Sequence, residues 1–191
     1  MTDNKILKTC PWAQGDDYIA YHDNEWGVPG YERNKLFEKL CLEGQQAGLS
    51  WITVLRKREH YRQCFHQFEP EKIARMSDSR IETLLTDTGL IRNRLKLYGI
   101  RKNALALLAL ERSGVDFVEF LWQFVGGRPV INHLASMSDA VAETAEARAM
   151  SKALKKAGFT FVGPTICYAF MQSMGMVNDH LTSCPCHPDN Q

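Results

Sequence analysis

The stretch Gly158-Phe-Thr-Phe-Val-Gly-Pro-Thr165 decides the fold, because it joins two segments of helical character through a tight turn. Gly158 is a natural helix terminator, since glycine adopts the left-handed conformation at low cost. Pro164 suits the first turn of the helix that follows. We therefore predict a helical hairpin, with one helix over residues 140–157 and a second over residues 165–174.

The second helix of this hairpin begins with backbone N–H groups that have no partner within the helix. Such groups, beside a glycine, can donate hydrogen bonds to a phosphate. Lys152, Lys155 and Lys156 add positive charge at the end of the first helix. Glycine also occurs in helical hairpins that bind nothing. We expect Gly163 and Thr165 to contact the backbone of a nucleic acid.

Further helices are predicted on both sides of the hairpin. Between residues 93 and 112, apolar residues recur every three or four positions, which is typical of an amphipathic helix. Two more helices are expected over residues 34–47 and 51–65. Capping-box spacing also predicts helix starts at Ser79 and Asp116. Because no segment shows sustained two-residue alternation, the fold class is expected to be all-α.

Composition limits the possible functions. The chain has 191 residues, of which 45% are hydrophobic and 24% are charged, so residues 1–191 are expected to form a single domain. It contains no apolar run long enough to cross a membrane and no apolar signal-peptide core, which predicts a cytoplasmic protein without a membrane partner. Since the net charge is only +1, a surface that binds nucleic acid would have to be a local patch.

The first 30 and the last 15 residues look irregular, and each end carries a cysteine and a histidine. Cys10 and His22 lie near one end, and His180 and Cys184 near the other, where a spacing of four residues would bring both onto one helical turn. Two thiolates and two imidazoles form the usual ligand set of structural zinc. A zinc ion at this site would tie both ends to the helical body.

This metal site has alternatives. The four residues could be unrelated, with the two histidines on the surface. Cys186 and His187 are also close enough in sequence to compete with Cys184 as ligands. A zinc ion with four protein ligands has no open coordination position, so its role would be structural rather than catalytic.

Glu43 is the most unusual residue of the helix expected over residues 34–47. It follows Leu36 and Leu40 and precedes Ala47 at helical spacings, which places it at the margin of the buried stripe. A carboxylate there is costly without a partner, so Glu43 is a candidate functional residue. The alternative is a boundary glutamate that reaches solvent or pairs with Lys39, one turn earlier.

Aromatic residues gather upstream of this helix and directly after it. Trp12, Tyr18, Tyr21 and Trp26 are interleaved with polar residues, which suits the wall of a pocket better than a continuous core stripe. Trp51 begins the next helix after a glycine-containing turn. Flat aromatic surfaces beside a carboxylate suit a planar, electron-poor or cationic ring.

Four strings carry a family resemblance. They are Tyr18-Ile-Ala-Tyr-His-Asp-Asn-Glu-Trp-Gly-Val-Pro29, Leu42-Glu-Gly-Gln-Gln-Ala-Gly-Leu-Ser-Trp-Ile52, Phe161-Val-Gly-Pro-Thr-Ile-Cys-Tyr168 and Val177-Asn-Asp-His180. They resemble the 3-methyladenine DNA glycosylase I family, the constitutive bacterial type, over roughly residues 10–184. The resemblance implies the helix-hairpin-helix glycosylase superfamily, with an all-α, bilobal body and a base pocket between the lobes.

The resemblance also implies roles for single residues. The implied zinc ligands are Cys10, His22, His180 and Cys184. Glu43 matches the acid that hydrogen-bonds the flipped base, Trp51 the aromatic residue that stacks on it and Tyr21 a pocket hydroxyl. The implied pocket wall consists of Trp12, Tyr18 and Trp26. Many members of the superfamily use a catalytic aspartate after the hairpin. Asp179 lies in that region, but it adjoins the implied zinc ligand His180, and we do not expect it to be the catalytic acid.

The expected activity follows from this resemblance and from the chemistry of the lesion. The enzyme would bind double-stranded alkylated DNA as a monomer, flip out 3-methyladenine and hydrolyse its N-glycosidic bond, with free base and an abasic site as products. Methylation makes the base cationic and a good leaving group, so little acid assistance is needed. No lysine of the pocket motifs suggests a Schiff base, so strand cleavage is not expected.

Two rival functions remain open from the sequence. A zinc-tethered module that binds damaged DNA without chemistry would account for the hairpin and the metal, but not for Glu43. A glycosylase for another lesion would have the same architecture.

Overall fold

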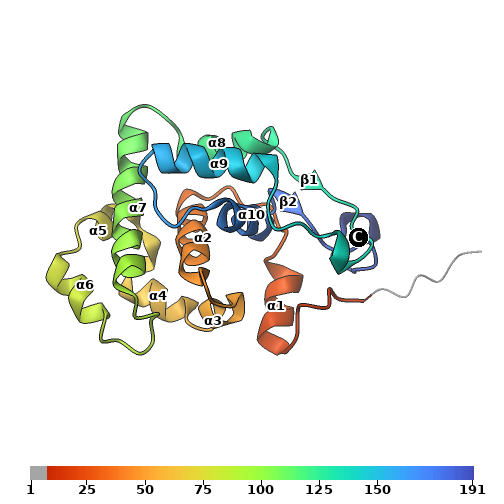
Figure 1. Cartoon of the computed structure of the whole chain (residues 1–191), viewed down its shortest axis with the longest axis horizontal. Coiled ribbons are helices and arrows are strands. Elements are labelled where there is room, and N and C mark those ends of the chain that lie inside the picture. Colours follow the sequence, from red (N-terminus) through yellow and green to blue (C-terminus); the bar gives the residue numbers. More distant parts are fainter. Residues whose placement is uncertain (1–7) are drawn as a thin grey trace, which may run out of the picture.

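Helix α2 (Arg33–Gln46) runs through the middle of the structure, a computed structural model that describes residues 8–191 (Figure 1). Every residue of α2 from Leu36 to Gln45 is buried, which explains why one helix carries both apolar and charged buried side chains. Helices that pack against it include α3 (Trp51–Leu55), α7 (Arg94–Arg112), α8 (Phe117–Trp122) and α10 (Pro164–Ser173).

The described chain is mostly helical, as predicted. The remaining α-helices are α1 (Asp16–Asn24), α4 (Arg58–Cys64), α5 (Pro70–Ala74), α6 (Asp78–Leu84) and α9 (Ala145–Lys156). Short 3-10 turns cover His66–Phe68, Gln123–Val125, Met137–Asp139 and Pro188–Asn190. The strands β1 (Val130–Ile131) and β2 (Val177–Asn178) form a parallel pair of two residues each, which the sequence analysis did not predict.

Helices α7 and α8 confirm two sequence predictions. The side chain of Asn93 accepts a hydrogen bond from the backbone N–H of Lys96 at 3.1 Å and caps α7. Asp116 caps α8 in the same way, accepting from the N–H of Glu119 at 2.9 Å. Side-chain caps of this kind satisfy one of the unpaired N–H groups at a helix start.

Three helix boundaries were predicted wrongly. The cap of α6 is Ser77, whose hydroxyl accepts from the N–H of Arg80, rather than Ser79. Helix α9 begins after Thr144, which caps it, so residues 140–144 are not helical. The helix predicted over residues 51–65 is divided into α3 and α4 at Arg56 and Lys57, whose side chains bind Asp17 and the carbonyl of Thr88.

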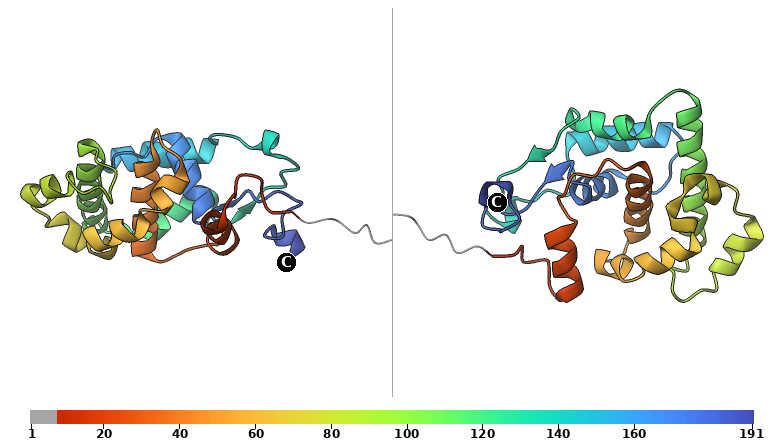
Figure 2. Two further views of the ribbon diagram at one scale, coloured as in Figure 1. Left: turned by 90° about the horizontal axis from the view of Figure 1, so that it is seen from below. Right: turned by 180° about the vertical axis from the view of Figure 1, so that it is seen from behind.

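The region expected to be irregular at the start of the chain contains helix α1. The two ends of the described chain lie on the same side of the molecule, away from α4 to α6 (Figures 1 and 2). The backbone N–H of Lys8 donates to the carbonyl of Ser183 at 2.8 Å. Residues 180–184 form turns instead of the predicted helical turn. No helix within residues 8–191 is long and apolar enough to cross a membrane.

The predicted helical hairpin is present as α9, a turn and α10. Gly158 has a φ of 95°, in the left-handed region that favours glycine. Asn103 of α7 holds the turn by bonding both the N–H and the carbonyl of Thr160, at 2.8 and 3.1 Å. Phe161 packs against α2 at Gly44, where a Cβ would lie 2.9 Å from the Phe161 Cβ. The glycine after Glu43 therefore allows the hairpin to approach α2 closely.

Candidate functional site

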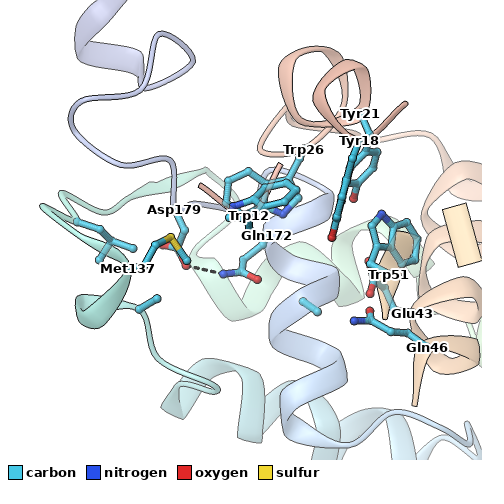
Figure 3. Close-up of a pocket in the computed structure, with 13 residues that line it drawn as sticks. Trp12, Tyr18, Tyr21, Trp26, Glu43, Gln46, Trp51, Met137, Gln172 and Asp179 are labelled. Carbon is cyan, nitrogen blue, oxygen red and sulfur yellow. Dashed lines mark hydrogen bonds between the residues drawn. The ribbon is translucent and has the colours of Figure 1, made fainter. Parts of the chain in front are cut away.

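A cavity of about 230 Å³ lies between α1, α2, the start of α3, α10 and the segment after β1. It brings together all six residues predicted to bind a planar ring: Trp12, Tyr18, Tyr21, Trp26, Glu43 and Trp51. Figure 3 shows Trp51 next to Glu43, and the hydrogen-bonded pair Gln172 and Asp179 next to Trp12.

The remaining residues of the wall were missed by the sequence analysis. They are Gln46, Leu134, Met137, Ala140, Ala169, Gln172 and Asp179. Gln46 could have been found, because it follows Glu43 by three positions and therefore shares its helix face. The contribution of residues 134–140 has no such signal, because that segment is irregular and largely exposed.

Glu43 is only 3% exposed, so it lies deeper than the margin position predicted for it. Burial raises the pKa of its carboxyl to about 7, and the opposing effects come from Lys39 and the Ser173 hydroxyl. Burial raises the pKa because it disfavours the charged form. Glu43 is thus a titratable group at the wall of a cavity, as expected of a functional carboxylate.

The aromatic residues form a continuous chain of ring contacts. Trp51 contacts Tyr21 with a centroid separation of 5.5 Å, and Tyr21 contacts Tyr18 at 6.3 Å. Trp12 contacts Tyr18 at 4.9 Å and Trp26 at 5.0 Å. The indole N–H of Trp51 is buried and has no hydrogen-bond partner among the described residues. The wall therefore presents ring faces and edges, which suits a flat ligand.

Asp179 lies in the same cavity, but its carboxylate is already bound. Its Oδ2 accepts from the Tyr168 hydroxyl at 2.6 Å and from the Gln172 amide at 2.7 Å, and its Oδ1 accepts from the Asn132 amide at 2.7 Å. Three donors fix the carboxylate in one orientation. This geometry suits a group that joins α10 to the segment after β1, and it fits the expectation that Asp179 is not the catalytic acid.

A second cluster gathers residues from the two ends of the described chain. The ligand atoms of His22, His180, Cys184 and Cys186 all lie within 4.8 Å of one another. Cys184 Sγ is 3.6 Å from His22 Nε2. Three of the four predicted metal ligands are therefore together, and the fourth member of this group is Cys186, the competing residue.

Cys10, the remaining predicted ligand, lies beside this group. It is fully buried, and burial raises the pKa of its thiol to about 12, with the neighbouring Cys184 adding to the shift. The backbone N–H of Leu181 bonds to it and acts in the opposite direction. The cluster thus offers five donor side chains for the four positions of a tetrahedral metal ion.

The hydrogen bonds around the two histidines test whether the cluster fits a metal. Nδ1 of His22 is 2.6 Å from the Asp23 carboxylate, and Nδ1 of His180 is 3.1 Å from the Asn178 amide oxygen. Both contacts engage Nδ1 and leave Nε2 for another ligand, as around ligating histidines. Nε2 of His180 is buried and unpartnered among residues 8–191. Burial lowers the pKa of His180 to about 4, so it is neutral at neutral pH, the form that binds metal.

The hairpin offers an open surface at its second helix. A Cβ at Gly163 would meet no atom within 4 Å, and Thr165 is exposed. Helix α10 starts with a proline, and the first helical hydrogen bond recorded at this end runs from the N–H of Cys167 to the carbonyl of Gly163. Glu43 and Thr165 line a common hollow beside the main cavity. The predicted backbone-binding residues therefore lie next to the predicted base-binding residue.

Comparisons with known proteins agree on one family. The family model described as methyladenine glycosylase matches residues 12–187. A protein of Escherichia coli (strain K12) named DNA-3-methyladenine glycosylase 1 is 54% identical over 186 residues, covering 97% of this chain and all of that protein.

Solved structures of the same family also match this chain. A crystal structure of 3-methyladenine DNA glycosylase I matches with a TM-score of 0.93 and 57% identity, covering 95% of this chain and all of that one. A variant of 3-methyladenine DNA glycosylase I in complex with 3-methyladenine matches with a TM-score of 0.90 and 38% identity, covering 94% of this chain and 97% of that one. The chain belongs to the methyladenine glycosylase family.

Proposed function

We propose that this protein is a DNA-repair glycosylase that removes 3-methyladenine from alkylated DNA by hydrolysing its N-glycosidic bond. The relatives named 3-methyladenine DNA glycosylase and the relative in complex with 3-methyladenine support this proposal. The observation that carries it is a buried carboxylate, Glu43, on a cavity walled by aromatic rings. This combination suits a flat ring with positive charge.

The size of the cavity supports a base as the ligand. At about 230 Å³, it is smaller than the roughly 300–1,000 Å³ of typical small-molecule pockets. The enzyme therefore takes in the base, while the sugar and phosphates stay outside. The base must leave the duplex to reach the cavity, and flipping costs least for a damaged base that pairs weakly.

Binding of the flipped base relies on Glu43 and Trp51. The ionised carboxylate of Glu43 accepts a hydrogen bond from the edge of the methylated adenine and balances its positive charge. Trp51 stacks on one face of the ring, with Tyr21 and the other aromatic residues completing the wall. The fixed Asp179 and its donors shape the opposite end of the cavity.

The chemical step uses the charge of the lesion itself. Water attacks the sugar C1′, the bond between C1′ and the base nitrogen breaks, and its electron pair neutralises the cationic base. The proton of the attacking water passes to solvent. The products are neutral 3-methyladenine and an abasic site. Because no lysine lines the described part of the cavity, no Schiff base forms and the strand stays intact.

The hairpin binds the DNA backbone in this proposal. The open Gly163 and the first N–H groups of α10 donate to a phosphate, while Lys152, Lys155 and Lys156, all exposed, add a local positive charge. This is the role of a helix-hairpin-helix motif. The enzyme acts on double-stranded DNA as a monomer of one bilobal domain.

Zinc is the proposed metal of the terminal cluster, held by Cys10, His22, His180 and Cys184. Mixed thiolate and imidazole donors and the free Nε2 of His180 support it. The ion is structural and takes no part in the reaction. Its ligands hold the ends of the chain against the cavity wall, since Trp12 and Trp26 contact the ring of His22 at 5.1 and 6.0 Å.

Substitution of Glu43 tests the function. In Glu43→Gln the side chain keeps its shape but loses the negative charge, so release of 3-methyladenine from methylated DNA should fall by about 10²-fold or more, as when an enzyme loses one electrostatic contact to the transition state. The released base is identified and counted by chromatography. Circular dichroism at the assay temperature serves as the control for folding, because loss of the carboxylate leaves the buried Lys39 ammonium without its balancing charge and should lower the melting temperature.

The wild-type protein separates the rival functions in the same assay. Release of 7-methylguanine or uracil in preference to 3-methyladenine would favour a different glycosylase. Tight binding of methylated DNA without release of any base would favour the non-catalytic module.

A further inference from the structure

Lys39 is a buried cation that the proposed chemistry does not use. It lies one turn before Glu43 on α2, and only 5% of its surface is exposed. Burying an ammonium group is costly unless it is paired. Lys35, one turn earlier on the same helix, is exposed. Lysines of α2 are therefore not buried in general; Lys39 is buried because it lies on the side of the helix that faces the cavity wall.

The ammonium of Lys39 contacts two residues of the cavity wall. Its Nζ lies 4.7 Å from the ring centroid of Tyr21 and 4.9 Å from that of Trp51, within the range of cation–π contacts. It is also 3.5 Å from the Tyr21 hydroxyl. Lys39 is not among the described residues that line the cavity. It therefore supports the two rings without reaching the ligand.

The charges around Lys39 show which carboxylate it balances. Three carboxylates act on it: Glu43 and Glu38 of α2, and Glu25 after α1. Glu25 is paired with Arg58 of α4 at 2.5 Å, and Glu38 with Arg62 of the same helix at 2.8 Å.

Glu43 differs from the other two carboxylates. It forms no ion pair with an arginine in the described structure, and Lys39 is the cation that acts on it. The other titratable groups that face it are the hydroxyls of Tyr18 and Tyr21, from α1. The burial of Lys39 thus places its charge where it balances Glu43.

We propose that Lys39 is a positioning residue of this cavity: it supports the rings of Tyr21 and Trp51 and keeps Glu43 in the carboxylate form that binds the methylated base. The second part rests on the proposed function. The first part rests on the contacts alone.

The charge of Lys39 should affect how base binding depends on pH. Burial raises the pKa of Glu43, and the positive charge of Lys39 opposes this rise. Without that charge, Glu43 keeps its proton to a higher pH, and base binding that needs the carboxylate begins at a higher pH. Burial lowers the pKa of Lys39 to about 8, but above that pH Glu43 is already ionised. The effect of Lys39 therefore appears on the acidic side of the profile.

Lys39→Met tests this inference, with Lys39→Arg and Lys35→Met as controls. Affinity for free 3-methyladenine is measured by calorimetry from acidic to alkaline pH, and any titration of the base itself is common to all variants. In Lys39→Met the acidic limb should move up by about 1–3 pH units, the shift that a nearby opposite charge causes. Lys39→Arg keeps the charge, so its base affinity should begin to rise at the same pH as in the wild-type protein. Lys35→Met should leave the profile unchanged.

Direct titration of Glu43 by carbon NMR in the ligand-free protein gives a second readout. Its carboxyl signal is the one that Glu43→Gln lacks, and its midpoint should rise in Lys39→Met by the same amount. The melting temperature should fall in Lys39→Met, because the buried carboxylate of Glu43 loses its balancing charge, and should be kept in Lys39→Arg. A residue with only a packing role would lower the melting temperature and leave the midpoint in place.

Two results would overturn the inference: an unchanged midpoint in Lys39→Met, or a change in base affinity that is equal at every pH. The second would mean that the ammonium acts only through packing or by repelling the base. Failure of the proposed function is a separate result. Wild-type protein that binds no 3-methyladenine at any pH would contradict that function, while the NMR titration would still decide whether Lys39 sets the ionisation of Glu43.

Discussion

The cavity and the terminal cluster each contain a buried nitrogen atom without a partner among residues 8–191: the indole Nε1 of Trp51 and Nε2 of His180. Both regions also suit a positive charge. In the cluster, thiols and imidazoles converge within 4.8 Å, and neighbouring groups orient the histidines. In the cavity, the carboxylate of Glu43 shares the wall with aromatic rings, and the second carboxylate, Asp179, is already bound by three donors.

The difference indicates which kind of cation each region suits. Closely converging donors enclose a small ion and release it slowly, which suits a permanent structural metal. A single carboxylate with flat aromatic surfaces binds a larger, softer cation and leaves room for it to enter and leave. The two regions meet at Trp26, whose ring lies 4.7 Å from the ring of His180 and also lines the cavity.

Removal of a proposed metal ligand should have the largest effect on stability. In Cys184→Ser we expect less than one zinc ion per chain and a loss of about 4 kcal/mol or more in the free energy of unfolding, the stabilisation given by a ligand at about 1,000 times its Kd. Metal analysis and chemical denaturation provide the two measurements.

Cys10→Ser and Cys186→Ser complete this experiment. The first should resemble Cys184→Ser, and the second should keep its zinc. The opposite pattern would make Cys186 the fourth ligand, as its place in the closest group of donors allows.

Removal of an aromatic ring from the cavity should weaken base binding and, because Trp51 is buried, also lower stability, while the metal stays bound. Trp51→Ala should weaken binding of 3-methyladenine by about 1–3 kcal/mol, the usual contribution of stacking by one aromatic residue. Zinc content should not change. Trp122→Phe, a buried tryptophan outside the cavity, serves as the control. If loss of Trp51 also released the metal, the two regions could not be treated as separate.

A change outside both regions should affect DNA binding alone. In Gly163→Ala the new methyl group meets no atom of the protein within 4 Å, and the φ of −64° suits alanine. Stability should therefore be unchanged or rise by about 0.4–1 kcal/mol. Affinity for duplex DNA should fall by about 10-fold if one charge-assisted hydrogen bond to phosphate is lost. Unchanged DNA affinity, with base and zinc binding also unchanged, would exclude this surface from the DNA contact.

Much of this arrangement could be predicted from the sequence where local signals suffice. Side-chain caps and helical periodicity predicted α7 and α8, and Gly158 with Pro164 predicted the hairpin. Local signals failed where a distant contact decides the structure. The break between α3 and α4 falls at Arg56 and Lys57, whose side chains bond to partners far along the chain.

The site follows the same rule. Residue type and spacing predicted the aromatic wall and Glu43, and all six predicted residues line the cavity. Sequence could not show that Lys39 would be buried against Tyr21 and Trp51, because that depends on how α1 and α3 pack on α2. Nor could it choose between Cys10 and Cys186, since both lie in irregular segments joined only by the fold.

The close approach of Phe161 to Gly44 has a consequence for how the enzyme would read DNA. The hairpin touches α2 at the residue directly after Glu43, with no space for even a methyl group between them. The end of the hairpin proposed to bind phosphate and the carboxylate proposed to bind the base are therefore held at a fixed separation by this contact. If the hairpin binds phosphate as proposed, the nucleotide that enters the cavity lies at a constant distance along the strand from the bound phosphate.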